Sequence, residues 1–121
     1  EILDQTGLLD KANRLAGSLT LLERKRLELA RALASGPKVL LLDEIAGGLT
    51  ESECGELVET IRDIRKTGMS IIWIEHIVHA LVSVVDRLIV INFGRLIENG
   101  EPQGVMKSPT VQEIYMGISA E

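Results

Sequence analysis

Aromatic residues and cysteines are scarce in this chain of 121 residues, and their scarcity excludes several functions. The only aromatic residues are Trp73, Phe93 and Tyr115, so Leu, Ile, Val and Ala must fill the core. A surface that stacks exposed nucleic-acid bases is therefore not expected. The one cysteine, Cys54, cannot form an internal disulfide, which fits a reducing compartment. We expect Cys54 to be a small, at least half-buried residue without a catalytic role.

Long apolar runs and a positive charge excess are also missing. No run approaches the roughly 20 apolar residues that cross a bilayer, and the acidic start is not a secretory signal. The net charge is -5, with acids and bases interspersed, which argues against binding to DNA, RNA or anionic lipid. A content of 45% apolar and 26% charged residues is typical of one globular domain or a piece of one. We expect a cytosolic protein, or one that docks on a membrane protein from the cytosol.

Two segments carry complete helix-start signals. Thr20 with Glu23 forms a capping box, and Thr50 with Glu53 forms a second one. Apolar residues then recur at helical spacing, up to Gly36-Pro37 in the first segment and to the region of Gly68 in the second. The predicted buried faces consist of Leu22, Leu29, Ala30 and Leu33 in the first helix and of Leu57, Val58, Ile61 and Ile64 in the second.

Two short apolar runs flank the second helix. Residues 39–42 and 70–75 are too short for helices and are typical of strands buried on both faces, with Trp73 in the core. A strand, a helix and a strand in this order imply parallel pairing through a right-handed crossover. Because the carboxyl ends of parallel strands meet at one edge of a sheet, we expect Asp43, Glu44 and His76 to emerge together.

The rest of the chain predicts short elements. Residues 2–6 form a short helix, 77–84 a helix, and 87–91 a strand that turns at 92–94 into an antiparallel strand over 95–98. A final helix begins at Ser108, with Pro109 at its first position and Val111, Ile114 and Tyr115 on one side. The fold class is α/β. We divide the chain into a helical region over 1–36, a core over 37–91 and a C-terminal hairpin and helix over 92–121.

The acid pair at the end of the first strand predicts chemistry. An apolar strand that ends in Asp43 and Glu44 is the Walker B pattern of nucleotide hydrolases. Asp43 would hold Mg²⁺, usually through water, because this ion prefers oxygen ligands. Glu44 would orient and deprotonate the attacking water. Taken alone, the same pattern also fits a solvated strand end without a catalytic role.

The sequence LTLLERKRLELARAL, residues 19–33, resembles the signature and signature helix of ABC-transporter ATP-binding subunits, which read LSGGQ and later ARAL. The family spacing from ARAL to the Walker B strand, and from there to a histidine after the next strand, is kept. The similarity spans the whole chain but only the second half of the family's nucleotide-binding domain. It implies a partial P-loop NTPase fold, with parallel strands, crossover helices, the signature helix, and a C-terminal hairpin and helix.

The resemblance also implies roles for individual residues. The signature, which would contact the ATP of a partner subunit, comprises Leu19, Thr20, Leu21, Leu22 and Glu23. The D-loop includes Gly47, Gly48 and Thr50, and His76 is the switch histidine that hydrogen-bonds the γ-phosphate. The implied cofactors are ATP and Mg²⁺. The implied partners are a second ABC ATPase subunit and membrane permease subunits, which would place the protein at the inner face of the cell membrane.

The chain departs from the family pattern at several positions. Leu21 and Leu22 replace the two signature glycines, Ile45 replaces a proline, and Thr50 replaces the D-loop aspartate. Signatures of this kind resemble those of ATP-binding proteins of branched-chain amino acid importers. Residues 111–117 resemble the C-terminal VxEAYLG segment of the same subfamily.

No G-x-x-x-x-G-K-[ST] phosphate loop occurs in the chain. We therefore expect that the isolated chain neither binds ATP tightly nor hydrolyses it, and that it self-associates through exposed sheet edges. Two other functions stay open: the ATPase head of a DNA-repair or chromosome-maintenance protein, and a non-catalytic interaction module on the same fold. Arg24, Lys25 and Arg26 are expected to form a solvated helix face with Glu23 and Glu28.

Overall fold

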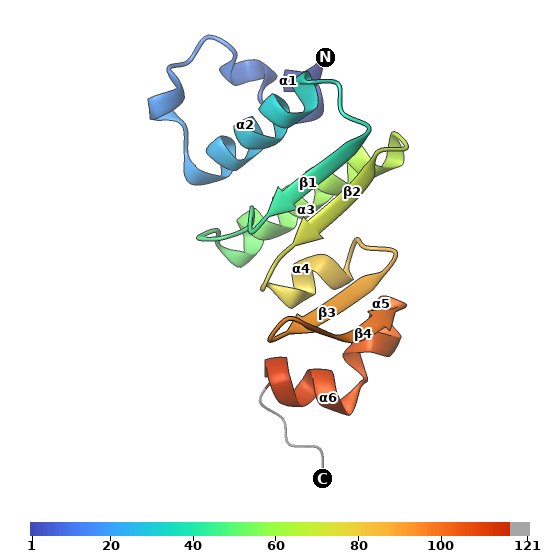
Figure 1. Ribbon diagram of the computed structural model, residues 1–121. Coiled ribbons are helices and arrows are strands. Elements are labelled where there is room, and N and C mark those ends of the chain that lie inside the picture. The colour runs from blue at the N-terminus through green and yellow to red at the C-terminus, as the bar shows by residue number, and fades with distance from the viewer. Residues whose placement is uncertain (117–121) are drawn as a thin grey trace. The chain divides into compact units, whose positions relative to one another are not determined.

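The computed structural model describes residues 1–116, without the side chain of Met116 (Figure 1). The chain forms two compact units, Glu1–Ala80 and Leu81–Glu121, and the division falls within the helix α4 (Val78–Val82). The predicted helix over 77–84 is thus present but shorter than expected. Over the described residues, no helix is both long enough and apolar enough to cross a membrane.

The first unit begins with short helical segments and then contains two long helices (Figure 1). Its helical segments are α1 (Ile2–Gln5), η1 (Leu9–Lys11), η2 (Ala16–Ser18), α2 (Leu21–Ala34) and α3 (Glu51–Lys66). Both predicted capping boxes are present, with the N-cap residues Thr20 and Thr50. The predicted apolar faces of α2 and α3 are buried throughout. The capping boxes therefore predicted the starts of both helices correctly.

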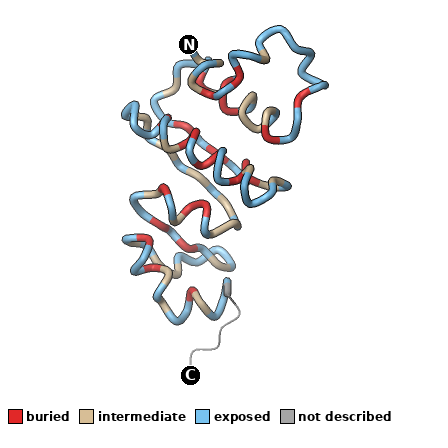
Figure 2. The backbone as a smooth tube through the Cα atoms, turned by 180° about the vertical axis from the view of Figure 1, so that it is seen from behind, coloured by how far each residue is buried: buried red, intermediate tan, exposed pale blue. Residues whose placement is uncertain are grey.

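The strands β1 (Val39–Asp43) and β2 (Ser70–Ile74) pair in parallel, as predicted. Leu40 lies opposite Ile71, and Asp43 lies opposite Ile74. The helix α3 covers one face of this pair of strands (Figures 1 and 2). The core between the helices and this face includes the fully buried side chains of Leu29, Leu40, Leu57, Ile61 and Ile64.

The prediction that both strands are buried on two faces is wrong. Leu41 is 70% exposed and Ile72 is 59% exposed, and Val39 and Ile74 on the same face are also exposed. The reason is that the described part of the first unit supplies helices to only one face of the pair, whereas a parallel sheet is normally covered on both. Trp73 lies on the opposite, covered face, opposite the buried Leu42, and is half-buried; its indole nitrogen is shielded from solvent and has no hydrogen-bond partner.

The prediction of a solvated basic face on α2 is wrong for Arg26 and incomplete for Arg24. The guanidinium of Arg26 forms an ion pair with Glu56 of α3, at 3.3 Å between Nη2 and Oε2, and its Nε is buried. Arg24 donates hydrogen bonds to the backbone carbonyl oxygens of Leu19 and Gly17, each at 3.1 Å. These contacts arise because α2 packs against α3 on one side and against the preceding loop on another.

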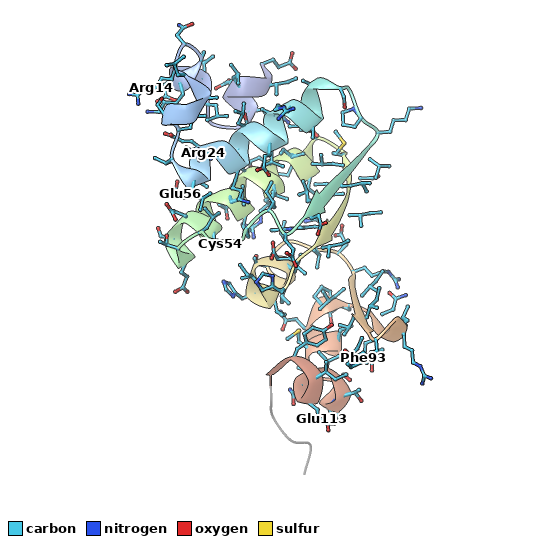
Figure 3. All side chains as sticks on the ribbon, turned by 60° about the vertical axis from the view of Figure 1, so that its left-hand side comes forward. Arg14, Arg24, Cys54, Glu56, Phe93 and Glu113 are labelled. Atoms are coloured by element: carbon cyan, nitrogen blue, oxygen red, sulfur yellow. The ribbon has the colours of Figure 1, made fainter. Side chains whose placement is uncertain are left out.

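The second unit is built on an antiparallel hairpin of β3 (Leu88–Asn92) and β4 (Arg95–Gly100). The turn residues Phe93 and Gly94 have φ angles of +49° and +73°, which gives the two-residue turn expected for a tight hairpin. Phe93 is 97% exposed at this turn (Figure 3). The strand β4 extends two residues beyond the predicted end at Glu98.

Three helical segments follow the hairpin: α5 (Pro102–Met106), α6 (Pro109–Val111) and η3 (Gln112–Met116). The sequence analysis missed α5. Ser108 is the N-cap of α6, with Pro109 at its first position, as predicted. Of the predicted apolar side, Val111 is buried, whereas Ile114 and Tyr115 are partly exposed, and the Tyr115 hydroxyl donates to the carbonyl oxygen of Ile91 at 2.6 Å. Gly117 of the predicted C-terminal motif lies outside the described residues.

Candidate active site

The acid pair and the histidine lie at the same edge of the parallel sheet. Asp43 is the last residue of β1 and Glu44 follows it, while His76 comes two residues after the end of β2. Nδ1 of His76 lies 3.6 Å from Oε1 of Glu44, and both side chains are mostly exposed. The predicted convergence is confirmed, and it leaves the two functional groups accessible to a ligand.

Glu44 has an unusual backbone conformation. Its φ angle is +50°, a left-handed value that costs a residue with a Cβ about 1–2 kcal/mol. The chain tolerates this conformation because Glu44 is bonded on both sides: its N–H donates to the carbonyl oxygen of Ile74 at 2.8 Å, and its own carbonyl oxygen accepts from Gly47 at 3.2 Å. Strained residues of this kind often occur at functional sites.

The predicted D-loop packs closely against the body of the first unit. Ile45 and Ala46 are buried, so the turn after Glu44 is anchored by apolar contacts. Gly48 has a φ angle of +80° and completes the turn. The hydroxyl of Thr50 accepts the N–H of Glu53 at 3.2 Å, so it serves as the helix cap of α3. Thr50 thus has a structural role at the position where the family carries an aspartate.

Sequence reasoning missed Glu75, although it lies between β2 and His76. Its side chain is fully buried, and its Oε2 accepts the N–H of Ala46 at 3.2 Å. Its Oε1 accepts the N–H of His76 at 3.1 Å and lies 3.4 Å from Nδ1 of the same residue. The available signal was strand alternation, because residues two apart share a face and Glu75 follows the half-buried Ile71 and Trp73.

The N-terminus of α2, which carries the predicted signature, is closed by its own capping box. The Thr20 N–H donates to Oε2 of Glu23 at 2.8 Å, and the Glu23 N–H donates to the Thr20 hydroxyl at 3.3 Å. The hydrogen bond from the Thr20 backbone, assisted by the positive charge of Lys11, lowers the pKa of Glu23. A carboxylate therefore already lies at this helix N-terminus, where it disfavours a phosphate.

The predicted signature and the predicted D-loop lie next to each other. A Cβ added at Gly48 would lie 3.1 Å from Cδ2 of Leu21. Leu22 is buried, and Leu21 remains partly exposed. The two leucines that replace the family glycines therefore have separate structural roles: Leu22 contributes to the core, and Leu21 covers the turn that follows Glu44.

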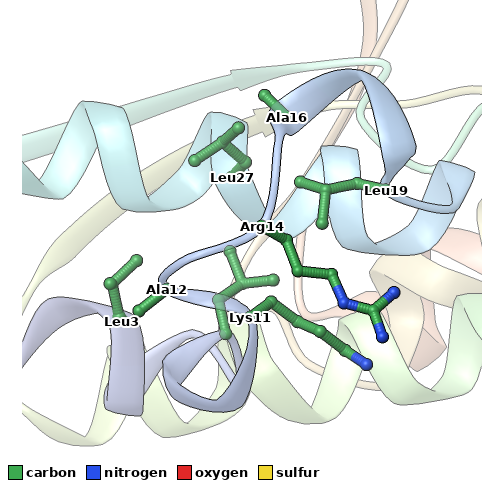
Figure 4. A pocket seen from close by; sticks show the side chains of 8 residues that line it. Leu3, Lys11, Ala12, Arg14, Ala16, Leu19 and Leu27 are labelled. Atoms are coloured by element: carbon green, nitrogen blue, oxygen red, sulfur yellow. The ribbon is translucent and has the colours of Figure 1, made fainter.

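A small cleft of about 120 Å³ opens beside Leu19 of the predicted signature (Figure 4). Leu19 is the only predicted site residue among its lining, and most of the other lining side chains are apolar. The basic side chain of Lys11 at this cleft is paired with Glu23, at 3.7 Å between Nζ and Oε1. The cleft is smaller than the roughly 300–1,000 Å³ of typical ligand sites, and of its two basic side chains, Lys11 and Arg14, Lys11 is already paired.

The residues at the sheet edge fit a magnesium ion only if the nucleotide helps to bind it. Residues 1–116 contain no group of three or more His, Cys, Asp or Glu side chains placed to hold a metal. Mg²⁺ in nucleotide hydrolases usually has one or two protein carboxylates, with waters and phosphate oxygens as its remaining ligands. Asp43 can supply the carboxylate, so the donor set agrees with an ion that binds together with the nucleotide.

The chain has the fold of part of an ABC-type ATP-binding cassette. The chain is 29% identical to MJ1267, an ATP-binding cassette of an ABC transporter whose crystal structure shows its ADP conformation; the TM-score is 0.88, over 97% of this chain and 48% of that one. The predicted family resemblance and the partial P-loop NTPase fold are confirmed. No protein-family model matches the chain.

The alignments with curated relatives also cover nearly all of this chain and about half of each relative. The chain is 38% identical over 116 residues to LivG of Escherichia coli K12, a high-affinity branched-chain amino acid transport ATP-binding protein. The aligned region covers 95% of this chain and 46% of LivG. It is 31% identical over 117 residues to LptB of Haemophilus influenzae, a lipopolysaccharide export system ATP-binding protein, over 97% of this chain and 48% of LptB. The chain thus spans about half the length of the curated relatives it matches.

Proposed function

We propose that this chain supplies the catalytic edge of an ABC transporter ATPase. The observation that carries the proposal is the 3.6 Å approach of His76 to Glu44 at the carboxyl edge of the two parallel strands. Ligands of open parallel sheets bind at this edge. Both side chains are exposed there, and the strained backbone at Glu44 is the kind of feature that a catalytic site retains.

Each residue at the edge has a chemical role in this proposal. The Glu44 carboxylate accepts a proton from the attacking water and orients it toward the terminal phosphate. His76 donates a hydrogen bond to a γ-phosphate oxygen. Asp43 would hold Mg²⁺, which would supply positive charge against the phosphates. A phosphate loop, which this chain does not contain, must come from another segment or chain.

The signature is proposed to meet the ATP of a second ATPase subunit. The first-turn N–H groups of Leu21 and Leu22 have no intrahelical acceptor and could donate hydrogen bonds to that ligand. The Glu23 carboxylate and the Leu21 side chain oppose a close phosphate approach, so we expect this contact to be weaker than in subunits that carry glycines. Membrane permease subunits would complete the assembly at the cytosolic face of the membrane.

The proposed transported solutes are branched-chain or similar amino acids. The higher identity to LivG and the C-terminal motif support this choice, and the match to LptB shows that related subunits also serve export. Because the solute contacts permease and binding subunits, this part of the proposal depends on the similarity and not on the edge geometry.

To test this proposal, the chain is fused behind the first half of an ABC cassette that contains a phosphate loop, and ATP hydrolysis by the joined protein is measured. Glu44→Gln should abolish a measurable rate, because an amide cannot accept the proton from water. Glu28→Gln is the matched control: the same change, at an exposed position of α2, should leave the rate within about twofold. A wild-type rate that survives Glu44→Gln would refute the proposed role of Glu44.

A second candidate function is a non-catalytic interaction module. It is favoured by the capping role of the Thr50 hydroxyl and by the Glu23 carboxylate at the signature helix. In this case the joined protein hydrolyses no ATP, with or without Glu44→Gln. A DNA-repair or chromosome-maintenance ATPase head is a third candidate without an observation in its favour.

The chain alone is proposed to bind ATP poorly and to self-associate. It has no phosphate loop, and apolar residues on one face of β1 and β2 are exposed. Titration calorimetry should give no micromolar affinity for ATP, and sedimentation should show a dimer or larger species. Micromolar binding, or a clean monomer at tens of micromolar protein, would contradict the respective expectation.

A further inference from the structure

A buried carboxylate beside the catalytic edge has no role in the function proposed above. The side chain of Glu75 is fully shielded from solvent, which strongly disfavours a charged group unless it is hydrogen-bonded. Both oxygens are bonded: Oε2 accepts from Ala46 and Oε1 accepts from His76, and both donors are backbone N–H groups. Hydrogen bonds to a charged acceptor are roughly twice as strong as neutral ones.

The two bonds connect the segments that follow the two strands. Ala46 lies two residues after Glu44, in the turn that leaves β1, whereas His76 lies two residues after β2. Glu44 itself donates its N–H to Ile74 at 2.8 Å. The segment from Glu44 to Ala46 is therefore attached to the end of β2 at both of its ends, once through a backbone carbonyl and once through Glu75.

The two hydrogen bonds of Glu75 hold the backbone at both sides of the edge, near Glu44 and at His76. The strained φ angle of Glu44 can persist only if its surroundings fix it, and the hydrogen bond that Ala46 donates to Glu75 does so from the buried side. The same carboxylate holds the backbone of His76 and lies 3.4 Å from its Nδ1.

We propose that Glu75 is a positioning residue that fixes Glu44 and His76 relative to each other by bridging the Ala46 and His76 N–H groups with one buried carboxylate. This inference rests on the proposed ATPase function. Glu75 touches neither the nucleotide nor the attacking water in this assignment. Its effect is on the approach of the two edge side chains, which small displacements can disturb strongly.

The first test uses the 121-residue chain and does not depend on activity. Glu75→Gln keeps the side-chain shape but replaces one acceptor oxygen by a donor amide. Hydrogen exchange measured by NMR should become at least about tenfold faster at the amides of Ala46 and His76, as the loss of a charged hydrogen bond implies, while Leu40 in β1 is unchanged. The ¹⁵N shift of His76 Nδ1 should also change. Glu28→Gln, at an exposed position of α2, is the control and should change none of these signals.

The second test uses the joined cassette described above. Glu75→Gln should lower kcat about 10–100-fold and leave KM for ATP within about threefold, as the loss of a positioning contact does. If the variant does not fold, Glu75→Asp is measured in its place, because it keeps the charge but is one methylene too short to bond both amides.

The outcomes separate this inference from the proposed function. Unchanged exchange at Ala46 and His76, or an equal acceleration throughout the first unit, overturns the positioning role. Full activity of Glu75→Gln alongside an inactive Glu44→Gln overturns it as well, and leaves the ATPase proposal standing. If the wild-type joined protein has no activity, the ATPase proposal fails, and the exchange data alone decide whether Glu75 forms the bridge.

Discussion

The substitution Gly48→Ala tests how the turn after Glu44 is held. Gly48 has a φ angle of +80°, which costs a residue with a Cβ about 1–2 kcal/mol. The new Cβ would also lie 3.1 Å from Cδ2 of Leu21, a contact that a small shift of this side chain relieves. The lower entropy of the unfolded alanine variant offsets about 0.4–1 kcal/mol. We therefore expect a net loss of about 1 kcal/mol in the free energy of unfolding.

Gly55→Ala is the matched control, because the same chemical change occurs in the same unit at a helical position. Gly55 lies on the exposed side of α3, and an added Cβ would meet nothing within 4 Å. Alanine in a helix interior is favoured over glycine by about 0.5–1 kcal/mol. The two variants should therefore change stability in opposite directions.

Urea unfolding followed by tryptophan fluorescence measures both effects, because Trp73 is the only tryptophan and lies in β2 of the first unit. A Leu21→Ala background separates the two causes, since it removes the steric contact but not the backbone strain. The cost of Gly48→Ala should persist there. If the cost disappears in this background, or if Gly48→Ala is as stable as the wild type, the argument from the left-handed backbone is refuted.

Three further predictions concern stability and reactivity. Thr50→Ala should lower the free energy of unfolding by about 1 kcal/mol through loss of the α3 cap, as urea midpoints will show; an unchanged midpoint would contradict the capping role. Because the pKa of Glu23 is lowered in the folded protein, its carboxylate stabilises the fold fully above the ordinary pKa of about 4.3. This stabilisation is lost as the pH falls through the pKa of the folded protein. Glu23→Gln should therefore reduce the drop in urea midpoint between pH 7 and pH 3. Burial first, and then nearby carboxylates, raise the pKa of the Cys54 thiol, so Ellman's reagent at pH 8 should react at least about tenfold more slowly with native than with urea-unfolded protein; equal rates would refute this.

The parts of the fold that the sequence predicted well are those with local causes. The capping boxes at Thr20 and Thr50 need only residues three positions apart, and both helices start where these pairs predict. The parallel pairing followed from a helix of sufficient length between two apolar runs. The hairpin turn at Phe93 and Gly94 likewise depends on adjacent residues.

The parts that were missed depend on contacts between segments or on weak local signals. The helix α5 has five residues and includes Gly104, so it shows no apolar period, although Glu101 caps it by accepting the N–H groups of Gln103 and Gly104. The exposure of Leu41 could not be predicted, because an apolar run indicates what a strand can bury and not which neighbours cover it. The pairing of Arg26 with Glu56 depends on how α2 packs on α3.

The candidate site shows the same limit in its most informative residue. Sequence spacing placed Glu44 and His76 at one edge but could not give the 3.6 Å approach, because this distance depends on a third side chain that reaches back from one segment to the other. Two departures from ordinary local preferences meet beside this edge: the left-handed backbone of Glu44 and the buried carboxylate of Glu75. Each costs stability by itself, and sequences retain such costs mainly where function requires a fixed geometry. Their occurrence together, just after the ends of β1 and β2, is the strongest physical reason to expect chemistry at this edge.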